Sequence, residues 1–168
     1  MHKIGIISLG CAKNQVDAEV MLGLLHKHGY KIVNQSDDAD IIIVNTCGFI
    51  GPAKEESIQA ILEQAKYKRQ GNCKALIITG CLGQRYSKEL LAEIPEIDVI
   101  VGTGNYSRIV DILEELNEGS SRDNYLGNLS AQLDDGLPRM LSTTGSTAYL
   151  KIAEGCDNCC TYCIIPKL

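Results

Sequence analysis

The sequence has no tryptophan, and Phe49 is its only phenylalanine, so its core must be built from Ile, Leu, Val and Ala. Long apolar runs are also missing. The longest uninterrupted ones, such as residues 41–44, are far too short to span a bilayer. The first residues lack the long apolar segment and small-residue cleavage site of a secretory signal. No membrane association and a cytoplasmic location are therefore expected.

An excess of basic residues is the next absence. The chain has 16 Lys and Arg against 21 Asp and Glu, which gives a net charge of −5 and a pI near 5.2. Non-specific binding of nucleic acid depends on a positive field that this balance does not supply. We therefore expect no nucleic-acid binding by this segment unless a local patch or another domain provides it, and we expect a monomer.

Cysteine, in contrast, is abundant. Eight cysteines occur in 168 residues, 45% of which are hydrophobic, a length that fits one domain or one domain and part of another. Without a secretory signal these thiols are expected to meet a reducing cytosol, where a disulfide framework does not persist. The count favours metal ligation or thiol chemistry.

The pattern of apolar residues predicts an α/β fold. Segments that are nearly continuous in Ile and Val, as in strands buried on both faces, lie at 3–11, 39–47, 74–81 and 98–104. Helical patterns lie between and after them, at 15–28, 53–69, 87–93 and 106–117. This alternation predicts a doubly wound, flavodoxin-like parallel sheet of about four to five strands with helices on both faces.

The composition also suggests domain boundaries. Residues 1–118 are expected to form the α/β domain. Residues 119–146 are rich in Gly, Ser, Asn and Asp and predict a linker. Residues 147–168 are expected to begin a second domain with one new strand at 147–155.

Three of the cysteines follow the predicted strands. Cys11, Cys47 and Cys81 each stand just past a strand, with a glycine beside each. Ligands of open α/β sheets bind outside the carboxyl ends of the strands, so the three thiols are expected to converge there. They could be buried small hydrophobes, a zinc site short of a fourth ligand, or the ligands of an iron–sulfur cluster with one open iron, which fits three ligands better.

A second group of cysteines ends the chain. Cys156, Cys160 and Cys163 lie within eight residues, a compact spacing that can wrap a [4Fe–4S] cluster and leave one iron free. The same spacing is also one face of a helix, so a core stripe is the alternative. Cys73 and Cys159 belong to neither triplet and are expected to be bystanders.

Four motifs stand in order along the chain: SLGCAKNQVDAE at 8–19, NTCGFI at 45–50 followed by AKEESI at 53–58, GCLGQRY at 80–86, and GCDNCCTYC at 155–163. The last resembles the cluster loop of radical S-adenosylmethionine enzymes. Together the motifs resemble the methylthiotransferases, and most of all the RimO family. The sister family MiaB, which acts on tRNA, usually has Gln-Met-Asn after the first cysteine, where this chain has Ala-Lys-Asn. The resemblance covers 1–118 and 147–168.

The resemblance implies two [4Fe–4S] clusters. Cys156, Cys160 and Cys163 would hold the one that binds S-adenosylmethionine and reduces it to a 5′-deoxyadenosyl radical. Cys11, Cys47 and Cys81 would hold an auxiliary cluster that carries the sulfur to be inserted. Tyr162 would lie near the adenine, or simply pack the loop.

The implied substrate is an aspartate of a small-subunit ribosomal protein, methylthiolated at its β-carbon. The implied electron donor is a protein such as flavodoxin or ferredoxin. Because a radical S-adenosylmethionine domain needs most of a (β/α) barrel, the chain is expected to be the N-terminal part of a longer enzyme and not to turn over alone. A tRNA methylthiotransferase, a stand-alone iron–sulfur or zinc module, and a flavodoxin-like domain with incidental cysteines remain alternatives.

The residues just after the first cysteine include several polar side chains. Lys13, Asn14, Asp17 and Glu19 could line the auxiliary site. They are expected instead to be a solvated first stretch of helix without a function.

Overall fold

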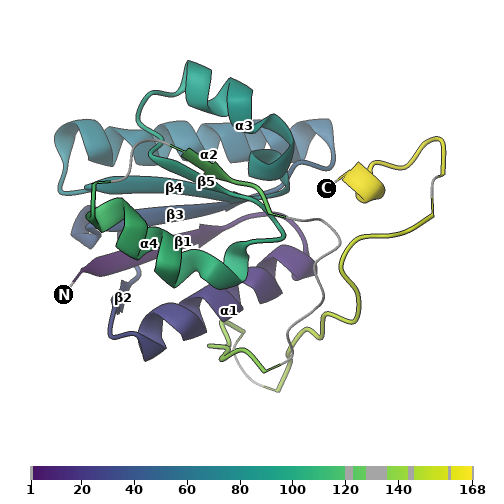
Figure 1. Ribbon diagram of the computed structural model, residues 1–168, viewed down its shortest axis with the longest axis horizontal. Coiled ribbons are helices and arrows are strands. Elements are labelled where there is room, and N and C mark those ends of the chain that lie inside the picture. The colour runs from purple at the N-terminus through teal and green to yellow at the C-terminus, as the bar shows by residue number, and fades with distance from the viewer. Residues whose placement is uncertain (1, 120–122, 128–135, 144–145, 159, 168) are drawn as a thin grey trace.

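The computed structural model describes residues 2–119, 123–127, 136–143, 146–158 and 160–167. A single parallel sheet in the order β2-β1-β3-β4-β5-β6 lies between helices (Figure 1). The strands are β1 (Lys3–Ser8), β2 (Lys31–Val33), β3 (Ile41–Thr46), β4 (Ala75–Gly80), β5 (Val99–Val101) and β6 (Asp123–Tyr125). The α-helices are α1 (Ala12–Lys27), α2 (Gly51–Gln70), α3 (Cys81–Glu93) and α4 (Ile109–Asn117), with short 3₁₀ turns η1 (Ser36–Asp38), η2 (Tyr106–Arg108) and η3 (Ile165–Lys167). The doubly wound prediction is confirmed, with six strands where four or five were expected.

The central strands are buried on both faces, which explains their continuous hydrophobicity. In β3, Ile41 and Ile43 pack with α1 and α4 on one face. The alternate residues Ile42 and Val44 pack with α2 and α3 on the other. One apolar core therefore packs against each face of the sheet, and together they fix the positions of the strand ends.

One helix differs from its prediction. We expected a short helix at 87–93, but α3 begins at Cys81, directly after β4, and contains a non-helical residue at Tyr86. The apolar pattern appears only after this kink, so the first turn gave no periodic signal. As a result, the third strand-end cysteine is the first residue of a helix.

Two strands were missed and one was wrongly predicted. β2 and β6 are three-residue edge strands with partly exposed side chains and no continuous apolar run, and β6 lies inside the stretch expected to be a linker. Residues 147–155 were predicted to form a strand, but in the part of the chain that the structure describes they pair with no other strand. Leu150 and Ile152 are 82% and 84% exposed there, so the apolar alternation that predicted a strand has no neighbouring strand to cover it in the described residues.

The segment after β6 returns along α1. Met140 donates its backbone N–H to the carbonyl of Glu19 at 2.9 Å. A Cβ on Gly23 would come within 2.5 Å of the Pro138 carbonyl oxygen, so the two backbones are in close contact. From there the chain continues to the side of the sheet where the strands end (Figure 1). In the part of the chain that the structure describes, no helix has the length and apolarity to cross a membrane.

Candidate functional site

The three strand-end cysteines surround one cavity. Cys11 is the N-cap residue of α1, Cys47 follows β3 directly, and Cys81 opens α3. All three line a cavity of about 660 Å³ at the carboxyl edge of the sheet. Cys11 is exposed, whereas Cys47 and Cys81 are buried. The structure thus brings together three thiols that are 36 and 34 residues apart in sequence.

Close packing of the backbone makes this convergence possible. Gly10 has φ +93, and a Cβ there would lie 2.8 Å from the Cβ of Cys47. Gly80 has φ +88, and a Cβ there would lie 2.6 Å from Oδ1 of Asn45. Both conformations and both approaches require glycine.

A buried asparagine ties the strand ends together. Asn14 is fully buried, and its Nδ2 donates to the carbonyls of Leu9 at 3.0 Å and Thr46 at 2.9 Å. The backbone carbonyl of Asn14 accepts a hydrogen bond from Nδ2 of Asn45 at 2.6 Å. Oδ1 of Asn14 lies 3.9 Å from Sγ of Cys81. The expectation that Asn14 is solvated is wrong, because the helix start is folded against the loops that carry the cysteines.

A serine on α2 fixes the second cysteine. The hydroxyl of Ser57 accepts a hydrogen bond from the N–H of Cys47 at 3.0 Å and contacts its carbonyl at 3.2 Å as a donor. Ser57 is completely buried. Nothing in the apolar pattern marks this residue, but it lies within the AKEESI motif on which the family resemblance depends.

The electrostatics of the cavity are mixed. Burial raises the pKa of the Cys81 thiol, the neighbouring Cys47 and Cys11 thiols and Asp17 raise it further, and the Lys13 ammonium lowers it. The helix starts at Cys11 and Cys81 favour negative charge. In this state Cys81 is a protonated thiol at neutral pH, and binding of a metal would have to displace its proton.

Cys73 lies away from this site. It precedes β4, is 6% exposed, and its thiol donates to the carbonyl of Ala75 at 3.2 Å. Burial raises the pKa of this thiol. Its position at the opposite end of β4 fits the expectation that it is a bystander. Cys159 lies outside the described residues.

The terminal triplet is arranged differently. Cys156 and Cys160 are exposed and Cys163 is partly buried. The N–H of Cys163 donates to the carbonyl of Cys160 at 3.1 Å, which closes a turn. The described residues between Cys156 and Cys163 form no helix, so the core-stripe alternative is wrong. Tyr162 is 90% exposed and does not pack the loop.

The two triplets approach the same cavity. Gly155, the residue before Cys156, and Ile165, two residues after Cys163, line it together with the strand-end cysteines. The chain therefore returns its last segment to the edge of the sheet where the first three thiols lie. This proximity was not predictable from the sequence.

The donor set at the strand-end cavity is soft, since all three cysteines supply sulfur. Among the described residues, no three His, Cys, Asp or Glu side chains are arranged to hold one metal ion. The strand-end triplet instead surrounds a cavity with room for a larger group, and all three of its donors are sulfur. Thiolates are the usual ligands of iron–sulfur clusters.

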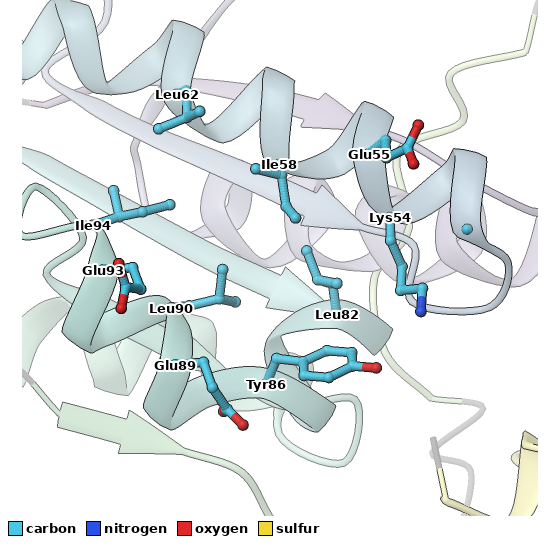
Figure 2. Close-up of a pocket in the computed structure, with 11 residues that line it drawn as sticks. Lys54, Glu55, Ile58, Leu62, Leu82, Tyr86, Glu89, Leu90, Glu93 and Ile94 are labelled. Atoms are coloured by element: carbon cyan, nitrogen blue, oxygen red, sulfur yellow. The ribbon is translucent and has the colours of Figure 1, made fainter.

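A second cavity, of about 630 Å³, lies between α2 and α3. Figure 2 shows Ile58 and Leu62 of α2 facing Leu82 and Leu90 of α3 across it, with Tyr86 at one side. None of the described residues that line it is a cysteine. Its lining is mostly apolar but includes Glu55, Glu89 and Glu93, and it shares no lining residue with the strand-end cavity.

Comparison with known proteins agrees with this geometry. Residues 3–102, which include all three strand-end cysteines, match the model of uncharacterized protein family UPF0004. The chain belongs to this family. UPF0004 is the N-terminal domain of the MiaB and RimO proteins.

The similarity extends over the whole chain. A protein of Desulforamulus reducens named ribosomal protein uS12 methylthiotransferase RimO is 58% identical over 168 residues. Proteins of the same name from Clostridioides difficile and Trichlorobacter lovleyi are 56% identical over 168 residues and 54% identical over 167. These matches cover 100%, 100% and 99% of the chain but only 38%, 38% and 37% of the three relatives. The predicted resemblance to the RimO family is confirmed, and the chain spans less than two fifths of these relatives.

Proposed function

We propose that this UPF0004 chain is the N-terminal part of a radical S-adenosylmethionine methylthiotransferase that modifies an aspartate of ribosomal protein uS12. The convergence of Cys11, Cys47 and Cys81 on one cavity carries the proposal. The names of the relatives support uS12 as the substrate. The proposed place of action is the cytoplasm, with a flavodoxin or ferredoxin as electron donor.

Each triplet has a role in this proposal. Cys11, Cys47 and Cys81 would hold an auxiliary [4Fe–4S] cluster, and Cys156, Cys160 and Cys163 a second cluster that binds S-adenosylmethionine near Tyr162. When bound, these groups supply reductive cleavage of S-adenosylmethionine and the sulfur for insertion.

The chain's own residues prepare the strand-end site. Asn14 and Ser57 hold the backbones around Cys11 and Cys47 by buried hydrogen bonds, so the ligands need not be ordered when a cluster binds. The apolar side chains of Phe49 and Ile50 also line the cavity, although both are about half exposed. We propose that residues 1–118 form this domain, that 119–146 link it onward, and that 147–168 begin the barrel domain.

The test uses the full-length gene product, reconstituted anaerobically and reduced. With S-adenosylmethionine and uS12, mass spectrometry is expected to find a methylthio group on an aspartate of uS12. The Cys11→Ala/Cys47→Ala/Cys81→Ala variant is expected to cleave S-adenosylmethionine still but to insert no sulfur. The 168-residue chain is expected to modify nothing. Methylthiolation of tRNA instead of uS12 would contradict the proposed substrate.

A further inference from the structure

Helix α1 and the segment before the terminal cysteines share a closed ring of four charges. Asp17 contacts Lys13 through Oδ2 at 3.0 Å and Lys151 through Oδ1 at 2.6 Å. Glu154 contacts Lys13 through Oε1 and Lys151 through Oε2, each at 2.6 Å. Each carboxylate thus bridges both ammonium groups. We call these four residues the charge ring.

The charge ring is largely shielded from water. The side chains of Asp17, Lys151 and Glu154 are 5%, 7% and 13% exposed, and that of Lys13 is 27% exposed. Lys151 also donates to the hydroxyl of Tyr106 at 3.0 Å and lies 4.5 Å from the centre of its ring. Burial alone would lower the pKa values of Lys13 and Lys151, but the two carboxylates raise both. Both ammonium groups are therefore charged at neutral pH.

The position of the charge ring suggests its purpose. Two members follow Cys11 on the first turns of α1, and the other two precede Cys156. Buried ion pairs contribute little net stability compared with apolar residues, because removing charges from water costs about as much as their attraction returns. Their strict geometry does fix how two segments sit against each other. No strand pairing holds the described residues 147–155, and the contacts that hold them include the charge ring and a hydrogen bond from Nη1 of Arg139 to the carbonyl of Tyr149 at 2.7 Å.

A second set of contacts, which we call the Glu19 clasp, holds the returning segment further along α1. Glu19 is fully buried and pairs with Arg139 through Oε2 at 2.6 Å. Its Oε1 accepts hydrogen bonds from the backbone and the hydroxyl of Ser142 at 2.9 and 2.6 Å. The returning segment is thus anchored near residue 140 before it reaches the charge ring.

We infer that the charge ring is a positioning device that sets the place of the terminal cysteine triplet relative to the strand-end triplet. Lys13, Asp17, Lys151 and Glu154 act through the cysteines that flank them and do not themselves ligate. The functional meaning of this placement rests on the proposed function, in which each triplet holds a cluster. Whether the charge ring holds the segment before Cys156 can be tested without any cluster.

The first test is limited proteolysis of the metal-free 168-residue chain. Trypsin needs the Lys151 side chain, which the charge ring holds, and cleavage follows the population of the open form. Asp17→Asn leaves every trypsin site in place and is expected to speed cleavage after Lys151 by about tenfold or more. Asp111→Asn, which removes a carboxylate paired with Arg108 on the surface of α4, is the matched control and is expected to leave this rate unchanged.

Two further variants keep the test decisive if Asp17→Asn fails to fold. Lys151→Met lies outside every helix and strand, and chymotrypsin cleavage after Tyr149 is expected to rise by a similar factor. Lys151→Arg keeps the charge and is expected to restore most of the protection. Cleavage of folded Asp17→Asn or Lys151→Met at the wild-type rate would overturn the inference.

The second test uses the reconstituted, reduced chain. Electron paramagnetic resonance is expected to show two clusters whose signals broaden each other in the wild type. In Lys151→Met the iron content is expected to stay the same while this broadening falls. Unchanged broadening would contradict a positioning role. A wild-type chain that binds no iron would contradict the proposed function, whereas proteolysis would still show whether the charge ring holds the segment before Cys156.

Discussion

Cys47 and Cys81 are 8% and 9% exposed and adjoin strands at the centre of the sheet. Cys156 and Cys160 are exposed, in a stretch without helix or strand in its described residues. The first triplet is positioned by the fold itself, through two apolar cores and a network of buried hydrogen bonds. The second is positioned by side-chain charges that reach back to α1. The same ligand type can thus be prepared by a rigid scaffold or by a tether, and the two respond differently to mutation.

The largest expected difference comes from glycines beside the two triplets. At Gly80 (φ +88) an added Cβ would lie 2.9 Å from the Thr46 nitrogen, whereas at Gly155 (φ +71) it would meet nothing within 4 Å. Gly80→Ala should therefore lower the free energy of unfolding by about 3 to 5 kcal/mol, from strain and overlap together. Gly155→Ala should cost at most about 2 kcal/mol. Urea denaturation of both variants measures this, and equal losses would contradict the comparison.

Buried hydrogen bonding gives the next largest effect. Asn14→Leu would leave the carbonyls of Leu9 and Thr46 without their donor, which should cost about 2 to 4 kcal/mol. The matched Asn158→Leu alters an exposed residue whose Nδ2 lies 3.6 Å from Sγ of Cys156, and it should change stability by less than about 0.5 kcal/mol. Thermal unfolding followed by circular dichroism compares them. A stable Asn14→Leu would show that the strand ends do not need this link.

Thiol reactivity should separate the triplets more modestly. In the metal-free chain at pH 7, iodoacetamide should label Cys156 and Cys160 about tenfold or more faster than Cys81, whose burial limits access and raises its pKa. Peptide mapping by mass spectrometry follows each site. Labelling in urea serves as the control and should abolish the difference. Equal rates in the folded chain would mean that the strand-end cavity is open to solvent.

The smallest effect concerns pH. Burial would raise the pKa of Glu19, but hydrogen bonds from Ser142 and Arg139 and the charge of Arg139 hold it below its ordinary value. Because the pKa of Glu19 is lower in the folded chain, its ionised carboxylate stabilises the fold above the unfolded pKa of about 4.3. This stabilisation is lost as the pH falls through the folded pKa. The stability difference between the wild type and Glu19→Gln should therefore shrink as the pH falls below about 4. A difference that stays constant between about pH 7 and 3 would contradict the Glu19 clasp.

The sequence predicted the long buried strands of this molecule better than its short edge strands. The long apolar strands β1, β3 and β4 and the gathering of Cys11 and Cys81 at their ends followed from hydrophobic runs and the rules of parallel sheets. β2 and β6 did not, since these short edge strands are partly exposed and lack the continuous apolar run that marked the equally short β5.

Polar residues were the main source of error. Asp17 and Glu19 were expected in solvent because charged residues usually are, but they are 4% and 0% exposed. Their partners, Lys151 and Arg139, lie 134 and 120 residues away, so no local pattern could reveal them.

The most direct measurement is an iron and sulfide count with Mössbauer spectra after anaerobic reconstitution of the 168-residue chain. The account predicts about eight irons in the wild type. It predicts about four in Cys11→Ala/Cys47→Ala/Cys81→Ala and about four in Cys156→Ala/Cys160→Ala/Cys163→Ala. Stoichiometric zinc with little iron, or an unchanged iron count in either triple variant, would contradict two separate three-cysteine clusters.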